Sequence, residues 1–135
     1  CGYGCDRASR GACFMTTLTA IVGAAESDLG VTNSSVMTLQ AQAITRALAD
    51  ADLKLSDVDG IATSGVSRFS ATQVADYLGL QPSWCDSTFA GGSAYEMYIA
   101  RASQAISAGQ AETIVISFAS NQRSARSRSV GGVVE

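Results

Sequence analysis

Two adjacent glycines, Gly91 and Gly92, stand directly before a long stretch rich in alanine and serine. Glycine allows a sharp backbone turn and lets another group approach the chain closely. A helix that begins there would offer free N–H groups and the positive end of its dipole to a carbonyl oxygen or an oxyanion. The two glycines are therefore candidate substrate-binding residues, with a simple packing turn before a buried helix as the alternative.

Ser93 carries the hydroxyl nearest to these glycines. The surrounding residues lack the G-x-S-x-G spacing of a nucleophile elbow, and the chain has no histidine to serve as a base or a metal ligand. We therefore expect Ser93 to be a helix N-cap or a first-turn hydrogen-bond donor in the same binding site, not a nucleophile. The sequence assigns no catalytic residue and no metal site.

Three arginines, Arg123, Arg126 and Arg128, gather near the carboxyl end of the chain. Arginine binds planar oxyanions through two parallel hydrogen bonds. Arg123 and Arg126 are therefore candidate substrate-binding residues for a phosphate or a carboxylate. The alternative is a solvated basic loop that balances an acidic protein.

Three further side chains near the glycines have a packing explanation. Cys85 lies in a stretch that predicts a strand, where a small buried residue is the expected role. Tyr95 and Tyr98 are three residues apart in a predicted helix and so share one face. We expect both in the core, while a phenol beside the glycine turn has the alternative role of donating to a substrate oxygen.

The composition excludes several classes of protein. Of 135 residues, 47% are hydrophobic and 16% are charged, and the net charge is −3, which excludes a disordered chain and gives no electrostatic basis for nucleic-acid binding. No apolar run reaches the roughly 18 residues of a membrane span. The four cysteines form no C-x-x-C pair, and with no apolar signal segment they favour a reducing, cytoplasmic location.

Strand-like and helix-like segments alternate along the chain. Short apolar runs rich in β-branched residues predict strands, and apolar residues at helical spacing predict helices. The expected strands are 19–24, 60–63, 84–89 and 112–120, and the expected helices are 38–53, 70–78 and 92–108. We expect Ser70 and Gln73 to form a capping box, and Gly79 and Gly109 to end helices. This alternation predicts an α/β sandwich with a mostly parallel sheet.

The chain divides into three regions. Residues 1–14 combine glycine, cysteine and arginine without periodicity, and we expect a leader that is foreign to the fold or disordered. Residues 15–120 form the expected α/β domain. Residues 121–135 are expected to begin a loop region that is truncated within the fold.

Five segments, in order and spacing, resemble the N-terminal half of the thiolase superfamily. The closest similarity is to the thiolase-like lipid-transfer proteins and the acetyl-CoA acetyltransferases of the sterol carrier protein x type. The segments are MTTLTAIVGAAESDLG (15–30), MTLQAQAITRALADADL (37–53), SDVDGIATSG (56–65), VADYLGLQPSW (74–84) and FAGGSAYEMYIARASQAISAGQAETIVIS (89–117). The resemblance implies the five-layered αβαβα thiolase sandwich, of which this chain supplies most of the first half.

The resemblance also carries expectations about activity. Counting back from the G-x-x-E that begins at Gly109, the position of the family's nucleophilic cysteine falls on Gly92, so an acyl-enzyme on that residue is not available. The implied substrate is a coenzyme A thioester, with no cofactor. The implied parent is an acyltransferase or a carbon–carbon lyase of sterol or lipid degradation, dimeric and paired with an OB-fold protein that binds acyl-CoA. The QRSARSR stretch matches the start of the loop region that meets acyl-CoA and the neighbouring subunit.

The residues leave two interpretations. In the first, the chain is the N-terminal part of a thiolase-like acyl-CoA enzyme and is inactive alone. In the second, it is a standalone α/β module that binds acyl-CoA, or that pairs with a second copy as a scaffold, without catalysis.

Overall fold

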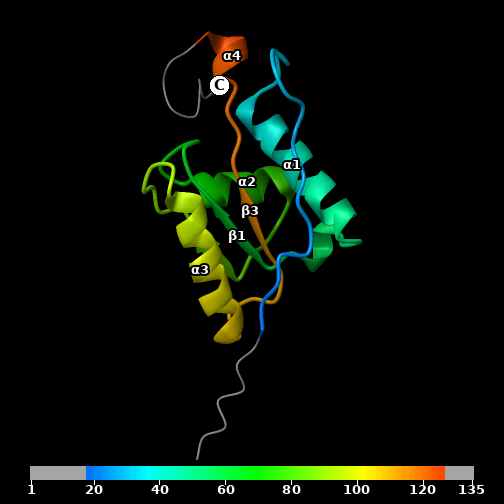
Figure 1. Cartoon of the computed structure of the whole chain (residues 1–135), viewed down its shortest axis with the longest axis vertical. Helices are drawn as coiled ribbons and strands as arrows, with labels where there is room; N and C mark the ends of the chain where they lie inside the picture. Colours follow the sequence, from blue (N-terminus) through cyan, green and yellow to red (C-terminus); the bar gives the residue numbers. More distant parts are fainter. Residues whose placement is uncertain (1–17, 127–135) are drawn as a thin grey trace, which may run out of the picture.

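The computed structural model describes residues 18–126, which form a three-stranded parallel sheet with helices on both faces (Figure 1). This confirms the α/β class and the parallel sheet. The elements, in chain order, are α1 (Val36–Asp50), a 3-10 turn (Leu55–Asp57), β1 (Gly60–Thr63), α2 (Ser70–Leu78), β2 (Trp84–Asp86), α3 (Ala94–Ser107), β3 (Ile114–Ser117) and α4 (Gln122–Ala125). Residues 1–14, the expected leader, and Arg128 lie outside the described residues.

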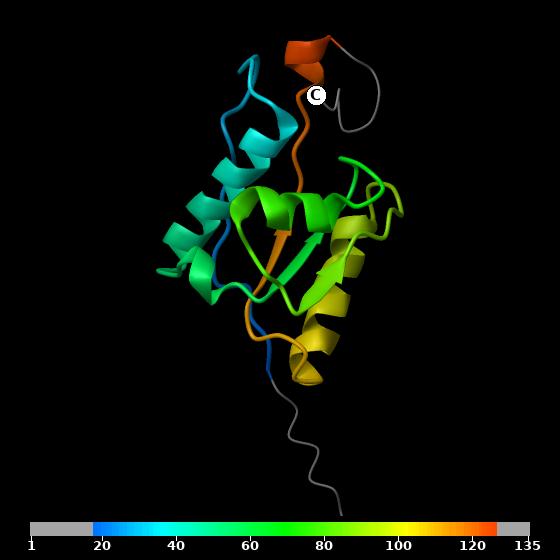
Figure 2. The same cartoon turned by 180° about the vertical axis from the view of Figure 1, so that it is seen from behind.

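The sheet has the order β2-β1-β3, so β1 is the central strand. Its middle residue Ile61 is in register with Cys85 on one side and Val115 on the other. Parallel neighbours need a crossover connection, and α2 and α3 supply the two crossovers. Figure 2 shows the strands running side by side between the helices.

Successive residues of β1 face opposite layers of helices, as the pleat of a strand requires. Ile61 is fully buried in a cluster with Ile44 of α1, Val74 of α2 and Val115 of β3. Ala62, equally buried, belongs to a second cluster with Ala94 and Tyr98 of α3. The helices α1 and α2 therefore cover one face of the sheet and α3 covers the other.

Asp59 ties together the amino ends of the three strands. Its carboxylate accepts the N–H of Glu112 at 2.8 and 3.0 Å and the N–H of Thr113 at 2.8 Å, just before β3. Its carbonyl oxygen accepts the N–H of Ser83 at 2.8 Å, just before β2. One residue at the start of β1 thus fixes the entry of both neighbouring strands.

The ends of the helices only partly match the prediction. Gly79 and Gly109 follow α2 and α3 with φ angles of 70° and 68°, which confirms their role as helix ends. The capping box is wrong, because Phe69 occupies the N-cap position of α2. The Ser70 hydroxyl instead accepts the N–H groups of Val66 and Ser67 at 3.2 and 3.0 Å, and so orders the loop before the helix.

The predicted strand at 19–24 is wrong, because residues 18–29 have no regular secondary structure. The segment runs along α1 in both views (Figures 1 and 2), and most of its polar contacts go to that helix. The Thr19 hydroxyl instead forms a hydrogen bond of 2.9 Å with the Ser103 hydroxyl of α3. The Ala24 N–H donates to the Asp50 carboxylate at 3.1 Å. Gly23 lies so close to the Ala47 carbonyl oxygen that a Cβ atom would collide with it. Contacts with the helix therefore take the place of strand pairing.

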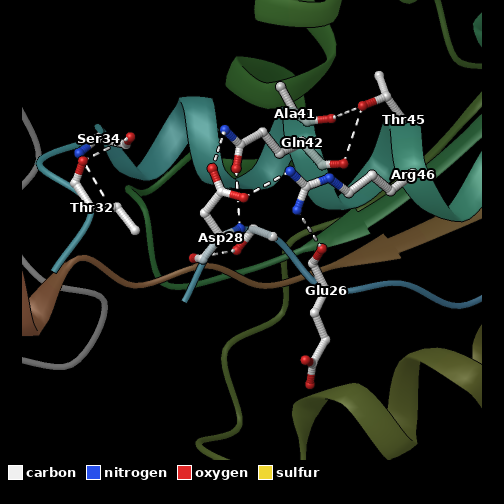
Figure 3. A network of polar contacts seen from close by, with 9 residues as sticks. Glu26, Asp28, Thr32, Ser34, Ala41, Gln42, Thr45 and Arg46 are labelled. Atoms are coloured by element: carbon white, nitrogen blue, oxygen red, sulfur yellow. Dashed lines mark hydrogen bonds and ion pairs between the residues drawn. The ribbon is translucent and has the colours of Figure 1, made fainter. Parts of the chain in front are cut away.

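A network of polar contacts fastens the next residues to α1 (Figure 3). Arg46 donates to the Glu26 carbonyl oxygen at 3.0 Å and to the Asp28 carboxylate at 2.8 Å. Gln42 donates to the same carboxylate at 3.2 Å. The hydrogen bond and the charge of Arg46 lower the pKa of Asp28. Because this ion pair is exposed, its contribution to stability is small.

A hollow of about 640 Å³ separates this segment from the outer edge of β3. Alanines of α1 and isoleucines of α3 line it, together with Ile114 and Ile116 of β3. These two isoleucines are only half-buried, whereas Val115 and Ser117 are buried. Strand β3 is therefore covered fully on the face toward α1 and α2 and only in part on the face toward α3.

The remaining differences are in the lengths of elements. The third and fourth predicted strands, 84–89 and 112–120, shorten to Trp84–Asp86 and Ile114–Ser117. Part of the expected loop after residue 120 is instead the single helical turn α4. Within residues 18–126, no helix is long and apolar enough to cross a membrane.

Candidate functional site

The loops that follow β1 and β2 meet at the carboxyl edge of the sheet. The loop after β1 leads to α2 on one face, and the loop after β2 leads to α3 on the opposite face. In open parallel sheets, ligands bind in the crevice where neighbouring loops leave toward opposite faces. This edge is therefore the candidate site, and the glycine turn belongs to the second of the two loops.

The predicted glycine turn lies at the surface, at the start of α3. Gly91 has a φ of 66°, a conformation that favours glycine, and its carbonyl oxygen accepts the Ala94 N–H at 3.1 Å. Gly92 differs in that its φ is not positive, and a Cβ atom there, as at Gly91, would have no heavy atom within 4 Å. Space beside Gly92 is thus open to another molecule. Substrate binding by Gly91, Gly92 and Ser93 stays a prediction.

The first turn of α3 carries unused hydrogen-bond donors. Ser93 occupies the N-cap position, but its hydroxyl makes no capping hydrogen bond. The N–H groups of Tyr95 and Glu96 have no acceptor among residues 18–126. Glu96 already places a carboxylate beside this helix end, and it is exposed. The local charge therefore suits a neutral carbonyl oxygen better than a free anion.

Tyr95 joins the first turn of α3 to the ends of β1 and β3. Its hydroxyl donates to the Ser64 carbonyl oxygen at 3.4 Å. Its ring meets those of Phe118 and Tyr98 edge to face, with centroids 5.3 and 5.7 Å apart. Burial raises the pKa of Tyr95 above its usual value, more than the hydrogen bond to Ser64 lowers it. Tyr95 is therefore a neutral donor near neutral pH.

A second polar network lies where β2 leads into the glycine loop. Arg101 donates through Nη1 to the Asp86 carboxylate at 2.7 Å and to the Thr88 hydroxyl at 2.8 Å. The Thr88 N–H donates back to Asp86 at 2.8 Å, and the Tyr98 hydroxyl donates to the Thr88 carbonyl oxygen at 2.7 Å. Burial alone would raise the pKa of Asp86, but the hydrogen bonds from Arg101 and Thr88 bring it below its usual value.

Sequence reasoning placed Tyr98 in the core, which is confirmed by its 0% exposure, but it missed this network. One signal was available. Tyr98 and Arg101 are three residues apart on a predicted helix, and Asp86 follows the start of a predicted strand that the same helix must cover. The pairing of Asp86 with Arg101 itself depends on how the helix crosses the sheet.

The structure does not bring the predicted arginines to the glycine turn. Arg123 lies on α4, Arg126 ends it with a φ of 50°, and both are exposed. Neither forms an ion pair with any residue in the range 18–126. The Ser124 hydroxyl on the same turn accepts the Thr32 N–H at 3.1 Å, which ties α4 to the loop before α1.

Cys85 is exposed, so the expectation that it is buried is wrong. It is the middle residue of β2, an edge strand that has a neighbour on one side only. Partial burial of the thiol raises its pKa, which disfavours the reactive thiolate. Among the described residues, no three side chains gather as ligands for a metal ion.

Comparisons with known proteins give matches among solved structures only. No family model and no curated protein matches the chain. An aldolase titled Ltp2-ChsH2(DUF35) is 30% identical with a TM-score of 0.69, over 78% of this chain and 28% of that one.

Two other structures have lower identity and are similar in fold. One is 3-oxoacyl-acyl-carrier-protein synthase III from Aquifex aeolicus VF5, with 21% identity and a TM-score of 0.55 over 63% of this chain and 29% of that chain. The other is a monomeric SCP2-thiolase-like protein type 1 from Mycobacterium smegmatis, with 24% identity and a TM-score of 0.56 over 71% of this chain and 22% of that chain. This chain spans between a fifth and a third of the length of each structure.

Proposed function

We propose that this chain, whose fold is thiolase-like, is the N-terminal part of an enzyme that acts on acyl-CoA thioesters. The observation that carries the proposal is the open glycine turn at the start of α3, on the carboxyl edge of the sheet. The 30% identity with a solved aldolase supports it.

The glycine turn would receive the thioester carbonyl oxygen. The free N–H groups of Tyr95 and Glu96 point out of the helix end, and the lack of a side chain at Gly92 leaves room for the thioester. Cleavage of the bond between the α and β carbons of a β-hydroxyacyl thioester releases the β carbon as a carbonyl compound, and its hydroxyl proton passes to a base. The bonding electrons form an enolate, whose negative charge develops on the former thioester carbonyl oxygen. Donors fixed at that position stabilise the charge that develops there.

A carbon–carbon lyase fits this chain better than an acyl transfer through a covalent intermediate. Gly92 occupies the position that the resemblance gives to the nucleophilic cysteine, and glycine has no nucleophile. Cys85 does not replace it, because it lies on the edge strand β2 and its pKa is raised. The acid and base groups would come from the rest of the protein. A DUF35 protein named with the aldolase neighbour suggests a partner of the predicted OB-fold kind.

Gly92→Val tests the role of the turn. We expect binding of acetyl-CoA, measured by titration calorimetry, to weaken about tenfold, a loss of about 1.4 kcal/mol. Valine would occupy the open space beside residue 92, and that space is empty of protein atoms, so the fold should tolerate the change. Binding of free coenzyme A, which has no thioester carbonyl, should weaken less.

Ala108→Val is the matched control, because it also introduces a valine, at the opposite, exposed end of α3. It should leave both affinities unchanged. Equal losses for acetyl-CoA and free coenzyme A in Gly92→Val would contradict carbonyl recognition. Turnover of an acyl-CoA by this chain alone would contradict its being only part of an enzyme, and would favour a self-sufficient catalyst.

A homodimer that pairs through β2 is the second candidate, favoured by the unpaired outer edge of that strand. In twofold antiparallel pairing centred on the middle of β2, Cys85 would lie opposite its own copy. We expect a dimer mass in light scattering, and a crosslinked dimer on oxidation of a variant with Cys85 as its sole cysteine. Cys85→Lys should give monomers, since like charges would then face each other. A wild-type monomer would contradict the dimer, and one thiolase-like neighbour is titled monomeric.

A further inference from the structure

The loop that carries the glycine turn is held by side chains at its beginning and by backbone contacts alone beyond that point. The loop clamp, defined as Asp86, Thr88, Tyr98 and Arg101, makes four hydrogen bonds of 2.7 to 2.8 Å around Thr88. Ser93 has the one polar side chain among residues 89–93, and its hydroxyl makes no hydrogen bond to the described part of the chain. Phe89 is 63% exposed. The clamp therefore ends at Thr88, directly before the part of the loop that no side chain supports, which is called the unsupported part below.

Both ends of this unsupported part are attached to the same helix. Ser93 leads directly into α3, and Thr88 is held by Tyr98 and Arg101 of α3. The residues between them form a short closed loop on one rigid element. Fixing the two ends of a loop restricts the conformations that it can adopt, and this restriction matters most where the loop contains glycine.

The clamp is also anchored to the rest of the sheet. Asp86 is the last residue of β2, and its side chain is only 9% exposed. The Ser87 hydroxyl accepts the Ala71 N–H of α2 at 2.9 Å. The start of the loop is thus held by helices on both faces of the sheet, Asp86 by α3 and Ser87 by α2.

We infer that Arg101 and Asp86 are positioning residues, which hold the Gly91–Gly92 turn in one place relative to the first turn of α3. They touch no ligand themselves. Acting through Thr88, they fix the position of Gly92, with the open space beside it, relative to the free N–H groups of the first turn of α3. A preorganised loop loses less conformational entropy when a ligand binds. The part of this inference that concerns ligand affinity depends on the proposed function.

Arg101→Met tests the inference, since methionine keeps much of the apolar stem and removes both hydrogen bonds. We expect the ¹⁵N heteronuclear NOE of residues 89–93 to fall to values typical of flexible loops, while those of β1 and α1 stay unchanged. The dissociation constant of acetyl-CoA should rise about three- to tenfold. Arg101→Lys, which can still donate to Asp86, should recover part of both effects.

Arg46→Met is the matched control. It breaks the other ion pair of the described chain, between Arg46 of α1 and Asp28. The N···O distance of that pair is 2.8 Å, against 2.7 Å for Arg101 and Asp86. It should leave residues 89–93 and the affinity unchanged. If Arg101→Met unfolds the chain, Thr88→Val removes only the contact between Arg101 and the hydroxyl, and should loosen the loop to a smaller degree.

The outcomes separate this inference from the proposed function. A loop that stays ordered in both Arg101→Met and Thr88→Val would overturn the positioning role, whatever the affinity. A loop that loosens while the wild-type chain binds no acetyl-CoA would support the positioning role and contradict the proposed function. A global loss of order that Arg46→Met reproduces would also overturn the inference.

Discussion

Replacement of Tyr98 by alanine is expected to lower the free energy of unfolding by about 3–5 kcal/mol. Among residues 18–126, Tyr98 is the largest fully buried side chain, with 0% exposure, and it fills the layer between α3 and the sheet beside Ala62 and Ala94. The truncation would leave a cavity and would also remove the hydrogen bond to the Thr88 carbonyl oxygen. Urea unfolding followed by circular dichroism measures the change.

Two further variants divide this effect into its parts. Tyr98→Phe keeps the ring and removes the hydroxyl, so we expect a loss of about 1 kcal/mol. Tyr77→Ala, on the exposed side of α2 at 54% exposure, should change stability by less than about 1 kcal/mol. A loss below 1 kcal/mol for Tyr98→Ala would show that the side chain is not packed as described.

Asp59→Ala is expected to have the second largest effect, a loss of about 2–3 kcal/mol. The carboxylate accepts the N–H groups of Glu112 and Thr113 where β3 begins, and alanine would leave both without that acceptor. Hydrogen bonds to an ionised group are stronger than neutral ones. The melting temperature and the urea midpoint should fall together.

Asp59→Asn should lose less, about 1 kcal/mol, because the amide oxygen still accepts one of these bonds. Asp76→Ala is the matched control, since Asp76 is exposed on α2 and its carboxylate accepts no hydrogen bond from residues 18–126. Equal stability of Asp59→Ala and Asp76→Ala would contradict the role of Asp59 as the tie between strands.

The sequence predicted best where a local signal and the tertiary structure agree. The segments 60–63 and 70–78 have the predicted bounds in the structure as β1 and α2. Gly60 and Gly79 bracket them, and glycines that end elements act through backbone geometry within a few residues. The same holds for the end of α3 at Gly109.

Predictions failed where an element depends on a distant partner. The apolar run at 19–24 has strand-like composition, but a strand also needs a neighbour, and Gly23 packs on α1 instead. The prediction that Cys85 is buried failed for a related reason. The local sequence does not show that β2 lies at the edge of the sheet, where Cys85 is exposed. The pairing of Asp86 with Arg101 spans the crossover through α3, and no local spacing fixes it.

The candidate site divides in the same way. The glycines and Ser93 are neighbours in the chain, so the sequence could place them at one turn. Arg123 and Arg126 are separated from that turn in the chain by α3 and β3, and α4 lies apart from α3 in both views (Figures 1 and 2). From the sequence alone, we could therefore predict that residues lie close together only where they belong to the same loop between two elements.

The sheet of the described chain has two unlike free sides, the outer side of β2 and that of β3. If copies add head to tail, with β2 of one against β3 of the next, each addition leaves the same two sides free at the ends of the assembly. Such head-to-tail contacts produce open filaments, instead of a defined particle, wherever the rotation between successive copies does not close a ring. Concentrated solutions of this chain should therefore gain viscosity and scatter light increasingly with time, unless other protein covers at least one side.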